Sequence, residues 1–197
     1  IQDAAHRFAV EVMRPIGEKL DKMTAEEAVA ADSPLFDYYR QVQEAGLLDI
    51  ETMATLSNQE KARLLPIIFE ELAWGDCGLV LGSMVTSFPA YAALQTGDAE
   101  LIKQFAGRSG CWLATQPDRG SDLVDIEGDE LHPGCKQSRP NLHARIDGDE
   151  VVITGQSSSW VSAAPYAETC LSLFLVLFVM GFLITMAPFQ KSGDRMH

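Results

Sequence analysis

Basic residues are scarce in this chain, which has 15 Lys and Arg residues against 28 Asp and Glu residues and a formal net charge of −13. The few Lys and Arg residues form no cluster. Because an acidic surface repels a phosphate backbone, we expect no nucleic-acid partner.

Cysteine and histidine are also few, with four of each in 197 residues. They are Cys77, Cys111, Cys135 and Cys170, and His6, His132, His143 and His197. None of them forms a C-x-x-C pair or another spacing suited to zinc or redox chemistry. We therefore expect no metal site, and we predict that the cysteines are thiols in a reducing compartment.

Motifs of several enzyme classes are missing as well. The sequence has no G-x-S-x-G elbow, no Walker loop and no G-x-G-x-x-G dinucleotide turn. The chain opens at Ile1, without Met and without a charged-then-apolar leader. This start predicts no secretory signal and is compatible with removal of the true N-terminus. The expected location is the cytoplasm, or the mitochondrial matrix of a eukaryote.

Apolar residues, by contrast, make up 47% of the chain, which is enough to bury the core of one large domain or two small ones. Helix start signals recur in the first hundred residues. Thr24-x-x-Glu27 and Ser57-x-x-Glu60 fit the capping box, in which a hydroxyl and a carboxylate satisfy the first turn of a helix. Ser33 followed by Pro34 predicts a third start. Its apolar face consists of Leu35, Tyr38, Tyr39, Val42 and Ala45, with Gly46 as the stop.

Two further segments predict buried helices. Residues 64–74 place Leu64, Ile68 and Leu72 at a spacing of four with Ile67 beside them, and Pro66 should kink this helix or delay its start. Residues 79–94 are apolar around most of the circumference, which predicts a central helix. We expect Gly97 to end it and Asp98 to begin a short helix through Phe105.

The composition changes near Gly110, where Gly, Pro, Asp and Ser become frequent and β-branched runs appear. We predict a domain boundary here, with a helical domain at 1–109 and a β-domain at 110–197. Residues 143–146 and 151–154 predict a hairpin, with Asp147-Gly148 as its tight turn. The predicted fold class is α+β.

Residues 169–190 contain no charged residue and are strongly apolar. Three interpretations stay open: two buried strands that meet near Gly181, a membrane or interface segment, and a sequence that has diverged or been disrupted. The first is favoured, because a strand covered on both faces shows a continuous apolar run.

Several short segments follow one another in a characteristic order. They are Phe8-Ala-x-Glu-x-x-x-Pro15, Glu70-Glu-Leu-Ala-Trp-Gly-Asp76, Gly97 with Lys103, Trp112-Leu-Ala-Thr-Gln-Pro-Asp-Arg-Gly-Ser-Asp122, Gly155-Gln-Ser-Ser-Ser-Trp-Val-Ser162 and Ala164-Pro-Tyr-Ala-Glu168. This series resembles the acyl-CoA dehydrogenase family over roughly residues 1–170. The most specific piece, 115–122, is similar to the family signature Thr-Glu-Pro-x-x-Gly-Ser-Asp.

The resemblance implies a helical N-domain followed by a partial antiparallel β-barrel-like domain, with the C-terminal helical domain missing. It also implies α,β-dehydrogenation of an acyl-CoA thioester with hydride transfer to FAD, as in fatty-acid β-oxidation. The expected partners are an acyl-CoA substrate, an electron-transfer flavoprotein, and other subunits of a homo- or hetero-oligomer.

By the same resemblance, Trp112, Ala114 and Thr115 would lie along the flavin ring, and Trp160 and Ser162 would pack against it from the next strand. Ser121 would meet the acyl-CoA or the flavin pyrophosphate. From the residues alone, the loop at 117–122 also fits an ordinary surface turn, and Trp160 also fits a core tryptophan.

Three departures from the family pattern stand beside these matches. Gln116 replaces an acidic residue, Ser157 replaces the lysine of a Gly-x-Lys-x-Trp element, and residues 127–142 have no counterpart. The family's catalytic glutamate lies in the C-terminal helical domain, so no residue here is assigned as the base. Two alternatives to an incomplete dehydrogenase are a non-catalytic truncated relative that no longer binds FAD, and a membrane-associated protein anchored by residues 169–190.

Overall fold

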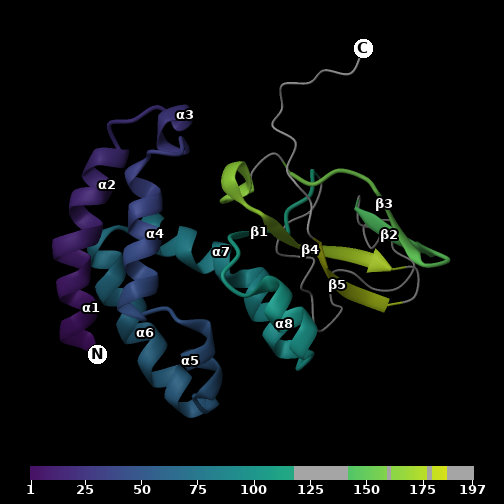
Figure 1. Cartoon of the computed structure of the whole chain (residues 1–197), viewed down its shortest axis with the longest axis horizontal. Coiled ribbons are helices and arrows are strands. Elements are labelled where there is room, and N and C mark those ends of the chain that lie inside the picture. The colour runs from purple at the N-terminus through teal and green to yellow at the C-terminus, as the bar shows by residue number, and fades with distance from the viewer. Residues whose placement is uncertain (118–141, 159–160, 177–178, 186–197) are drawn as a thin grey trace. The chain divides into compact units, whose positions relative to one another are not determined.

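Helices fill the first part of the chain and strands follow, as Figure 1 shows for this computed structural model. The structure describes residues 1–117, 142–158, 161–176 and 179–185. The chain divides into two compact units, Ile1–Ser87 and Phe88–His197. The change from helix to strand falls between Phe105 and Gly110. The predicted domain boundary at 109/110 stays a prediction.

The first helical rod has three parts: α1 (Gln2–Phe8), the π-helical turn η1 (Ala9–Met13) and α2 (Arg14–Leu20). Pro15 stands in the first turn of α2. Proline has no N–H and its ring crowds the carbonyl four residues back, so an α-helix cannot run through it undisturbed. The wider turn at η1, directly before Pro15, is where this rod departs from α-helical geometry.

The predicted helix starts are confirmed. Thr24 forms a capping box with Glu27 before α3 (Ala25–Ala28), and Ser57 forms one with Glu60 before α6 (Asn58–Gly75). Ser33 caps α4 (Pro34–Ala45), which ends at Gly46 with φ +65°, in the left-handed region. Between them lies α5 (Ile50–Thr55), capped by Asp49.

The helix α6 begins at Asn58, so Pro66 lies inside it and does not delay its start. Ile68 and Leu72 are buried as predicted, but Ile67 is 38% exposed. Ile67 follows Pro66 on the side of the helix that turns away from the core, while the four-residue spacing keeps Ile68 and Leu72 on one stripe.

The predicted apolar helix is α7 (Cys77–Thr96), followed by Gly97 at φ +69° and by α8 (Ala99–Phe105), which Asp98 caps. Among the described residues α7 is the one helix long and apolar enough to cross a membrane by length and composition, with 33% of its most apolar window buried. Core helices of water-soluble proteins pass the same test. Leu81 is 54% exposed, so the expectation of a helix covered on several sides fails at this position.

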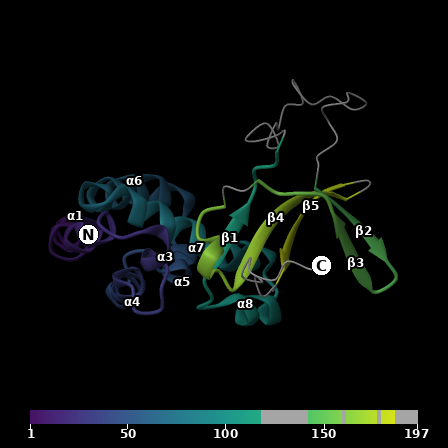
Figure 2. The same ribbon diagram turned by 90° about the horizontal axis from the view of Figure 1, so that it is seen from above.

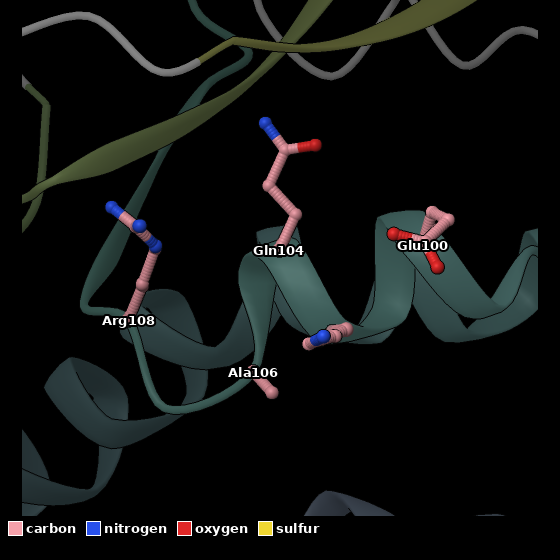
Figure 3. Close-up of a pocket in the computed structure, with 5 residues that line it drawn as sticks. Glu100, Gln104, Ala106 and Arg108 are labelled. Atoms are coloured by element: carbon pink, nitrogen blue, oxygen red, sulfur yellow. The ribbon is translucent and has the colours of Figure 1, made fainter.

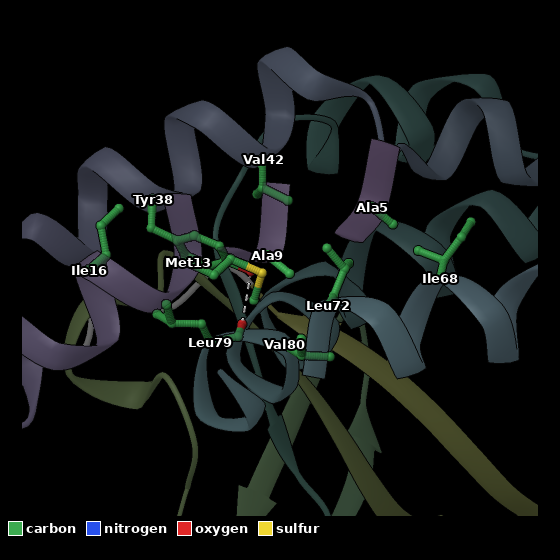
Figure 4. Close-up of a cluster of buried hydrophobic side chains, with 10 residues drawn as sticks. All are labelled: Ala5, Ala9, Met13, Ile16, Tyr38, Val42, Ile68, Leu72, Leu79 and Val80. Carbon is green, nitrogen blue, oxygen red and sulfur yellow. Dashed lines mark hydrogen bonds between the residues drawn. The ribbon is translucent and has the colours of Figure 1, made fainter. Parts of the chain in front are cut away.

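The core of the helical unit gathers buried side chains from its long helices (Figure 4). These residues are Ala5, Ala9, Met13, Ile16, Tyr38, Val42, Ile68, Leu72, Leu79 and Val80. Tyr38 is fully buried, and its hydroxyl donates a hydrogen bond to the Leu79 carbonyl (3.2 Å) and shares another with the Ser83 hydroxyl (2.7 Å). The one phenol therefore joins α4 to α7.

The predicted motif at residues 70–76 holds this unit together. Glu71 accepts hydrogen bonds from Gln2 (2.6 Å) and lies 2.7 Å from the His6 ring, and these two bonds lower the pKa of Glu71. Leu72 is fully buried. Gly75 faces the backbone of Ala9 in η1. Within the helical unit, the motif thus has a structural role.

Two more members of this motif fix its ends. The Arg14 guanidinium donates to the Trp74 carbonyl (2.9 Å) and lies over the Trp74 ring, 5.8 Å from its centroid. The Asp76 carboxylate accepts the Leu79 N–H (2.8 Å), which caps the first turn of α7.

Tyr38 makes a testable contribution to stability at alkaline pH. Burial raises its pKa from 10.0 to about 12, with Ser83 opposing and Asp76 adding to the shift. The neutral phenol is favoured in the fold, so the contribution is complete below pH 10 and is lost as pH rises from 10 to about 12. We expect the free energy of unfolding to fall by on the order of 2 kcal/mol across this window.

Tyr38→Phe should lose about 1 kcal/mol at neutral pH and should lack the additional fall between pH 10 and 12. The measurement is urea unfolding of both proteins, followed by circular dichroism at several pH values. Tyr91→Phe, which alters an exposed tyrosine, is the matched control and should keep the fall. Parallel curves for the wild type and Tyr38→Phe would contradict this assignment.

The strands form one mixed sheet, seen from above in Figure 2. They are β1 (Gly110–Leu113), β2 (His143–Asp147), β3 (Glu150–Thr154), β4 (Thr169–Val176) and β5 (Val179–Thr185). β4 pairs with β5 along most of its length, with β1 at residues 169–172 and with β2 at residues 175–176. Since a strand has two edges, β1 and β2 share the edge of β4 opposite β5.

Both predicted strand pairs form, but each turn is displaced. The hairpin of β2 and β3 is confirmed, with Asp147 opposite Glu150. Its two loop residues are therefore Gly148 and Asp149, not Asp147 and Gly148. Gly148 has φ +62° and Asp149 does not have a positive φ, which matches a turn with glycine first.

The apolar segment at 169–185 forms the antiparallel pair β4 and β5. The predicted turn near Gly181 is wrong, because Gly181 lies inside β5 opposite Phe174 and the strands end at Val176 and Val179. Thr169, Cys170 and Leu171 at the start of β4 are buried. Residues 186–190 lie outside the described part.

The expectation of an antiparallel β-barrel-like domain is correct only in part. The pairs β2–β3 and β4–β5 are antiparallel, whereas β1–β4 and β2–β4 are parallel. The coarser expectation, a helical region followed by a small sheet, is what the described residues show, and they show no closed barrel.

Candidate functional site

Trp112 lies on β1, opposite Leu171 of β4. Its side chain is 37% exposed, and its ring meets Phe88 edge-to-face with centroids 5.1 Å apart. An aromatic pair of this geometry fixes the ring plane while it leaves one part of the ring open. The Trp112 ring is therefore fixed by its contact with Phe88 and remains partly exposed to solvent.

Ser109 anchors β1 against the start of β4. The Ser109 hydroxyl has its one proton between two acceptors, the Tyr166 carbonyl (3.1 Å) and the Glu168 carboxylate (3.3 Å). The Glu168 carboxylate also accepts the Ser109 N–H (3.1 Å). The Ser109 carbonyl accepts from the N–H groups of Glu168 and Thr169 and from the Thr169 hydroxyl. No motif in the sequence marks Ser109, because its partners lie 57 to 60 residues away.

Removal of the Ser109 hydroxyl should loosen this junction. We expect Ser109→Ala to lower the free energy of unfolding of the strand unit by about 1 kcal/mol, because the hydrogen bond that the hydroxyl donates to the Tyr166 and Glu168 oxygens is lost. Tryptophan fluorescence during urea unfolding measures it in a Trp74→Phe background, which removes the tryptophan of the helical unit.

Ser157→Ala serves as the matched control, since among the described residues the Ser157 hydroxyl makes only a 3.5 Å contact, with the neighbouring Ser158 carbonyl. Equal losses in the two variants would show that the Ser109 bonds add nothing specific.

Two segments of the predicted site meet at Thr115. The Ser158 N–H donates a 2.8 Å hydrogen bond to the Thr115 carbonyl, across 43 positions of sequence. The Thr115 residue is exposed and Ala114 is half-buried. The structure thus brings Thr115, at the end of the segment that carries Trp112 and Ala114, to Ser158.

Gln116 has a buried side chain, with 2% exposure. Its Oε1 accepts the Leu142 N–H at 2.9 Å, which ties the end of this segment to the start of β2. Its Nε2 is buried and has no hydrogen-bond partner among the described residues. A carboxylate at this position would offer an acceptor in place of that buried donor.

Ser162 is exposed and precedes Ala163, which has φ +67°. A residue with a side chain seldom adopts this left-handed conformation, and such positions gather at functional sites. The short helix η4 (Ala164–Tyr166) follows. Trp160, Ser121 and most of residues 127–142 lie outside the described part of the chain, so their predicted roles stay predictions.

These residues fit a flavin in their chemistry. Trp112 offers an aromatic face, Thr115 and Ser162 offer exposed hydroxyls, and one hydrogen bond joins the two segments that carry them. Among the described residues, no group of three or more His, Cys, Asp or Glu side chains is placed to hold a metal ion.

A separate, open pocket of about 460 Å³ lies at the end of α8 (Figure 3). It is lined by Glu100, Lys103, Gln104, Ala106 and Arg108. Gln104 and Arg108 extend to the same side in Figure 3. None of the described residues predicted to meet flavin (Trp112, Ala114, Thr115 and Ser162) lines this pocket.

Comparison with known proteins rests on structure. No family model matches the sequence, and no curated protein matches it. A crystal structure of glutaryl-CoA dehydrogenase from Mycobacterium smegmatis matches with a TM-score of 0.70 and 20% identity, over 94% of this chain. A second crystal structure, of a glutaryl-CoA dehydrogenase from the same organism in complex with FADH2, matches with a TM-score of 0.65 and 17% identity.

The chain spans 44% of the length of each of these two dehydrogenases, and 94% of its own length lies within the match. At this level of identity the likeness concerns the fold. The resemblance seen in the short motifs and the likeness seen in the backbone thus agree: this chain has the fold of a part of glutaryl-CoA dehydrogenase, an enzyme of the acyl-CoA dehydrogenase family.

Proposed function

We propose that this chain is the flavin- and acyl-CoA-binding part of an acyl-CoA dehydrogenase. The observation that carries the proposal is the hydrogen bond from Ser158 to Thr115, which joins two motif segments next to Trp112. Its support is the fold shared with glutaryl-CoA dehydrogenase, one structure of which contains FADH2.

The residues have distinct roles in this proposal. Trp112 and Trp160 pack against the flavin ring, while the hydroxyls of Thr115 and Ser162 donate hydrogen bonds to its polar edge. Ser121 binds the acyl-CoA. When bound, FAD would accept the hydride that leaves the β carbon of the acyl chain. The protein would orient the ring and keep water from it.

The base that removes the α proton is proposed to come from residues outside these 197, in a longer form of the protein or in another subunit. Such a base is a carboxylate whose pKa is raised by a desolvated pocket. An electron-transfer flavoprotein is the proposed acceptor of the electrons, and an oligomer the proposed assembly.

Flavin retention tests the proposal. The purified chain is incubated with FAD and passed through a gel-filtration column, and the absorbance spectrum of the protein peak is recorded. We expect the flavin bands to remain with the wild type and to be lost, by at least about tenfold in affinity, from Trp112→Ala, since an aromatic stacking contact and its buried area disappear.

Matched variants separate binding from folding. Trp74→Ala removes a 65% exposed tryptophan of the helical unit and should keep the flavin. Thr115→Val should weaken binding while Thr115→Ser, which keeps the hydroxyl, should not. A wild type that loses its flavin on the column would contradict the proposal.

A non-catalytic relative is the second candidate, and it is favoured by the buried Gln116 Nε2, which has no hydrogen-bond partner among the described residues. If the ancestral site used an acid at 116 and a lysine at 157, the double variant Gln116→Glu/Ser157→Lys should retain flavin where the wild type does not. Retention by the double variant alone would identify this chain as a relative that has lost its cofactor.

A further inference from the structure

Two buried cysteines face each other in the sheet. Cys111 of β1 and Cys170 of β4 are register partners, and both strands run in the same direction. Cys111 is fully buried and Cys170 is 5% exposed. Both carry thiols in this structure. Neither cysteine belongs to the proposed flavin site, so flavin binding does not explain why they are paired.

The pairing brings the two side chains within reach of each other. Neighbouring strands lie about 4.8 Å apart, and register partners project from the same face of a sheet. Disulfides join residues whose Cα atoms are about 4.4 to 6.8 Å apart. A bond between the two sulfurs therefore needs side-chain rotation and a small adjustment of the strands, but no change of register.

Electrostatics supports the same proximity. The pKa of the Cys111 thiol is raised to about 12, first by burial and then by the charge that Cys170 would carry. A thiolate at Cys111 is therefore disfavoured, and the contribution of Cys170 to this shift requires that the two side chains lie near each other.

We propose that Cys111 and Cys170 are a site of oxidative modification, at which a small-molecule disulfide converts the two thiols to a bond between β1 and β4. This inference is independent of the proposed flavin site.

The reaction is two thiol–disulfide exchanges. The Cys170 sulfur, the more exposed of the two, attacks one sulfur of the small disulfide and releases one small thiol. The Cys111 sulfur then attacks the Cys170 sulfur of this mixed disulfide and releases the second small thiol. The two cysteine protons pass to the released thiols, and the two cysteines are oxidised while the small disulfide is reduced. Because Cys111 is held protonated, the second step is the slow one.

The test uses the full chain with Cys77→Ser/Cys135→Ser, so that only this pair remains. The folded protein is incubated with oxidised glutathione, then quenched with acid, and its intact mass and its thiols in denaturant are measured. We expect a mass loss of about 2 Da and a fall from two titratable thiols to none. Adding Cys111→Ser provides the control, which should stop at the mixed disulfide on Cys170.

A parallel incubation in urea decides the result. If the folded protein keeps both thiols while the unfolded protein forms the bond, the sheet holds the sulfurs apart and the proposal is overturned. Disulfide-linked dimers in place of the mass loss would also overturn it. Peptide mapping of the oxidised wild type gives the same decision without substitutions: a peptide that links residues 111 and 170 supports the proposal, and its absence overturns it.

Discussion

Replacing Gly75 with alanine should lower the free energy of unfolding of the helical unit by about 3 kcal/mol. A Cβ atom at position 75 would lie 2.6 Å from the Ala9 carbonyl oxygen and 2.9 Å from the Ala9 Cα. These neighbours are backbone atoms of η1, which cannot rotate away as a side chain can. The added methyl group must therefore push the end of α6 away from the first helical rod.

The measurement is urea unfolding of Gly75→Ala and wild type, followed by circular dichroism at 222 nm. Gly78→Ala, three residues along the chain in the first turn of α7, is the matched control, since its new Cβ would meet only one side-chain oxygen, Asp76 Oδ1, at 3.3 Å. We expect it to change stability by less than about 1 kcal/mol. Similar losses in both variants would mean that the close approach to Ala9 does not matter.

Leu72→Ala is expected to cost a similar amount, about 3 kcal/mol, through a different mechanism. Leu72 is fully buried, with a relative exposure of 0%, and belongs to the core of the helical unit (Figure 4). Truncation removes buried methyl groups and leaves a cavity that helices on several sides must either tolerate or close.

The same helix supplies the control for this variant. Ile67→Ala alters a side chain of equal size that is 38% exposed, so we expect a loss of less than about 1 kcal/mol. Chemical unfolding of both variants against the wild type gives the comparison. A loss at Ile67 as large as that at Leu72 would show that the apolar face of α6 includes position 67, as its sequence spacing predicted.

Leu72 and Ile67 also show how well the residue spacing of a helix predicts which side chains are buried. A spacing of four residues identifies one stripe of α6, and Ile68 and Leu72 are both buried. The edge of that stripe depends on which helices pack beside α6, and the sequence of α6 alone does not identify those helices. Ile67 sits at this edge and was wrongly predicted to be covered.

In the candidate site, the motifs identified the segments 112–116 and 155–162, but not how they meet. The Ser158 bond to Thr115 joins two backbone groups, which every residue has, so no residue type in the sequence predicts it. The Ser109 network uses side chains as well, but its partners lie 57 to 60 residues away, beyond the reach of a local motif. The role of Gln116 as a link to Leu142 was missed for the same reason, since its partner is a backbone N–H across 26 positions.

What the sequence determined by itself is local. The capping boxes at Thr24 and Ser57, the Ser33 cap and the stop at Gly46 form as predicted, and β2 and β3 pair as predicted with the turn shifted by one residue. Each of these features depends on side chains and turns within a few residues. Tertiary structure alone decided the parallel pairing of β1 and β2 with β4, the position of the turn between β4 and β5, and the contact of Gly75 with Ala9. These features join segments far apart in the chain, where the gain from burial and pairing is set by the partner surface and not by the residue's own neighbours.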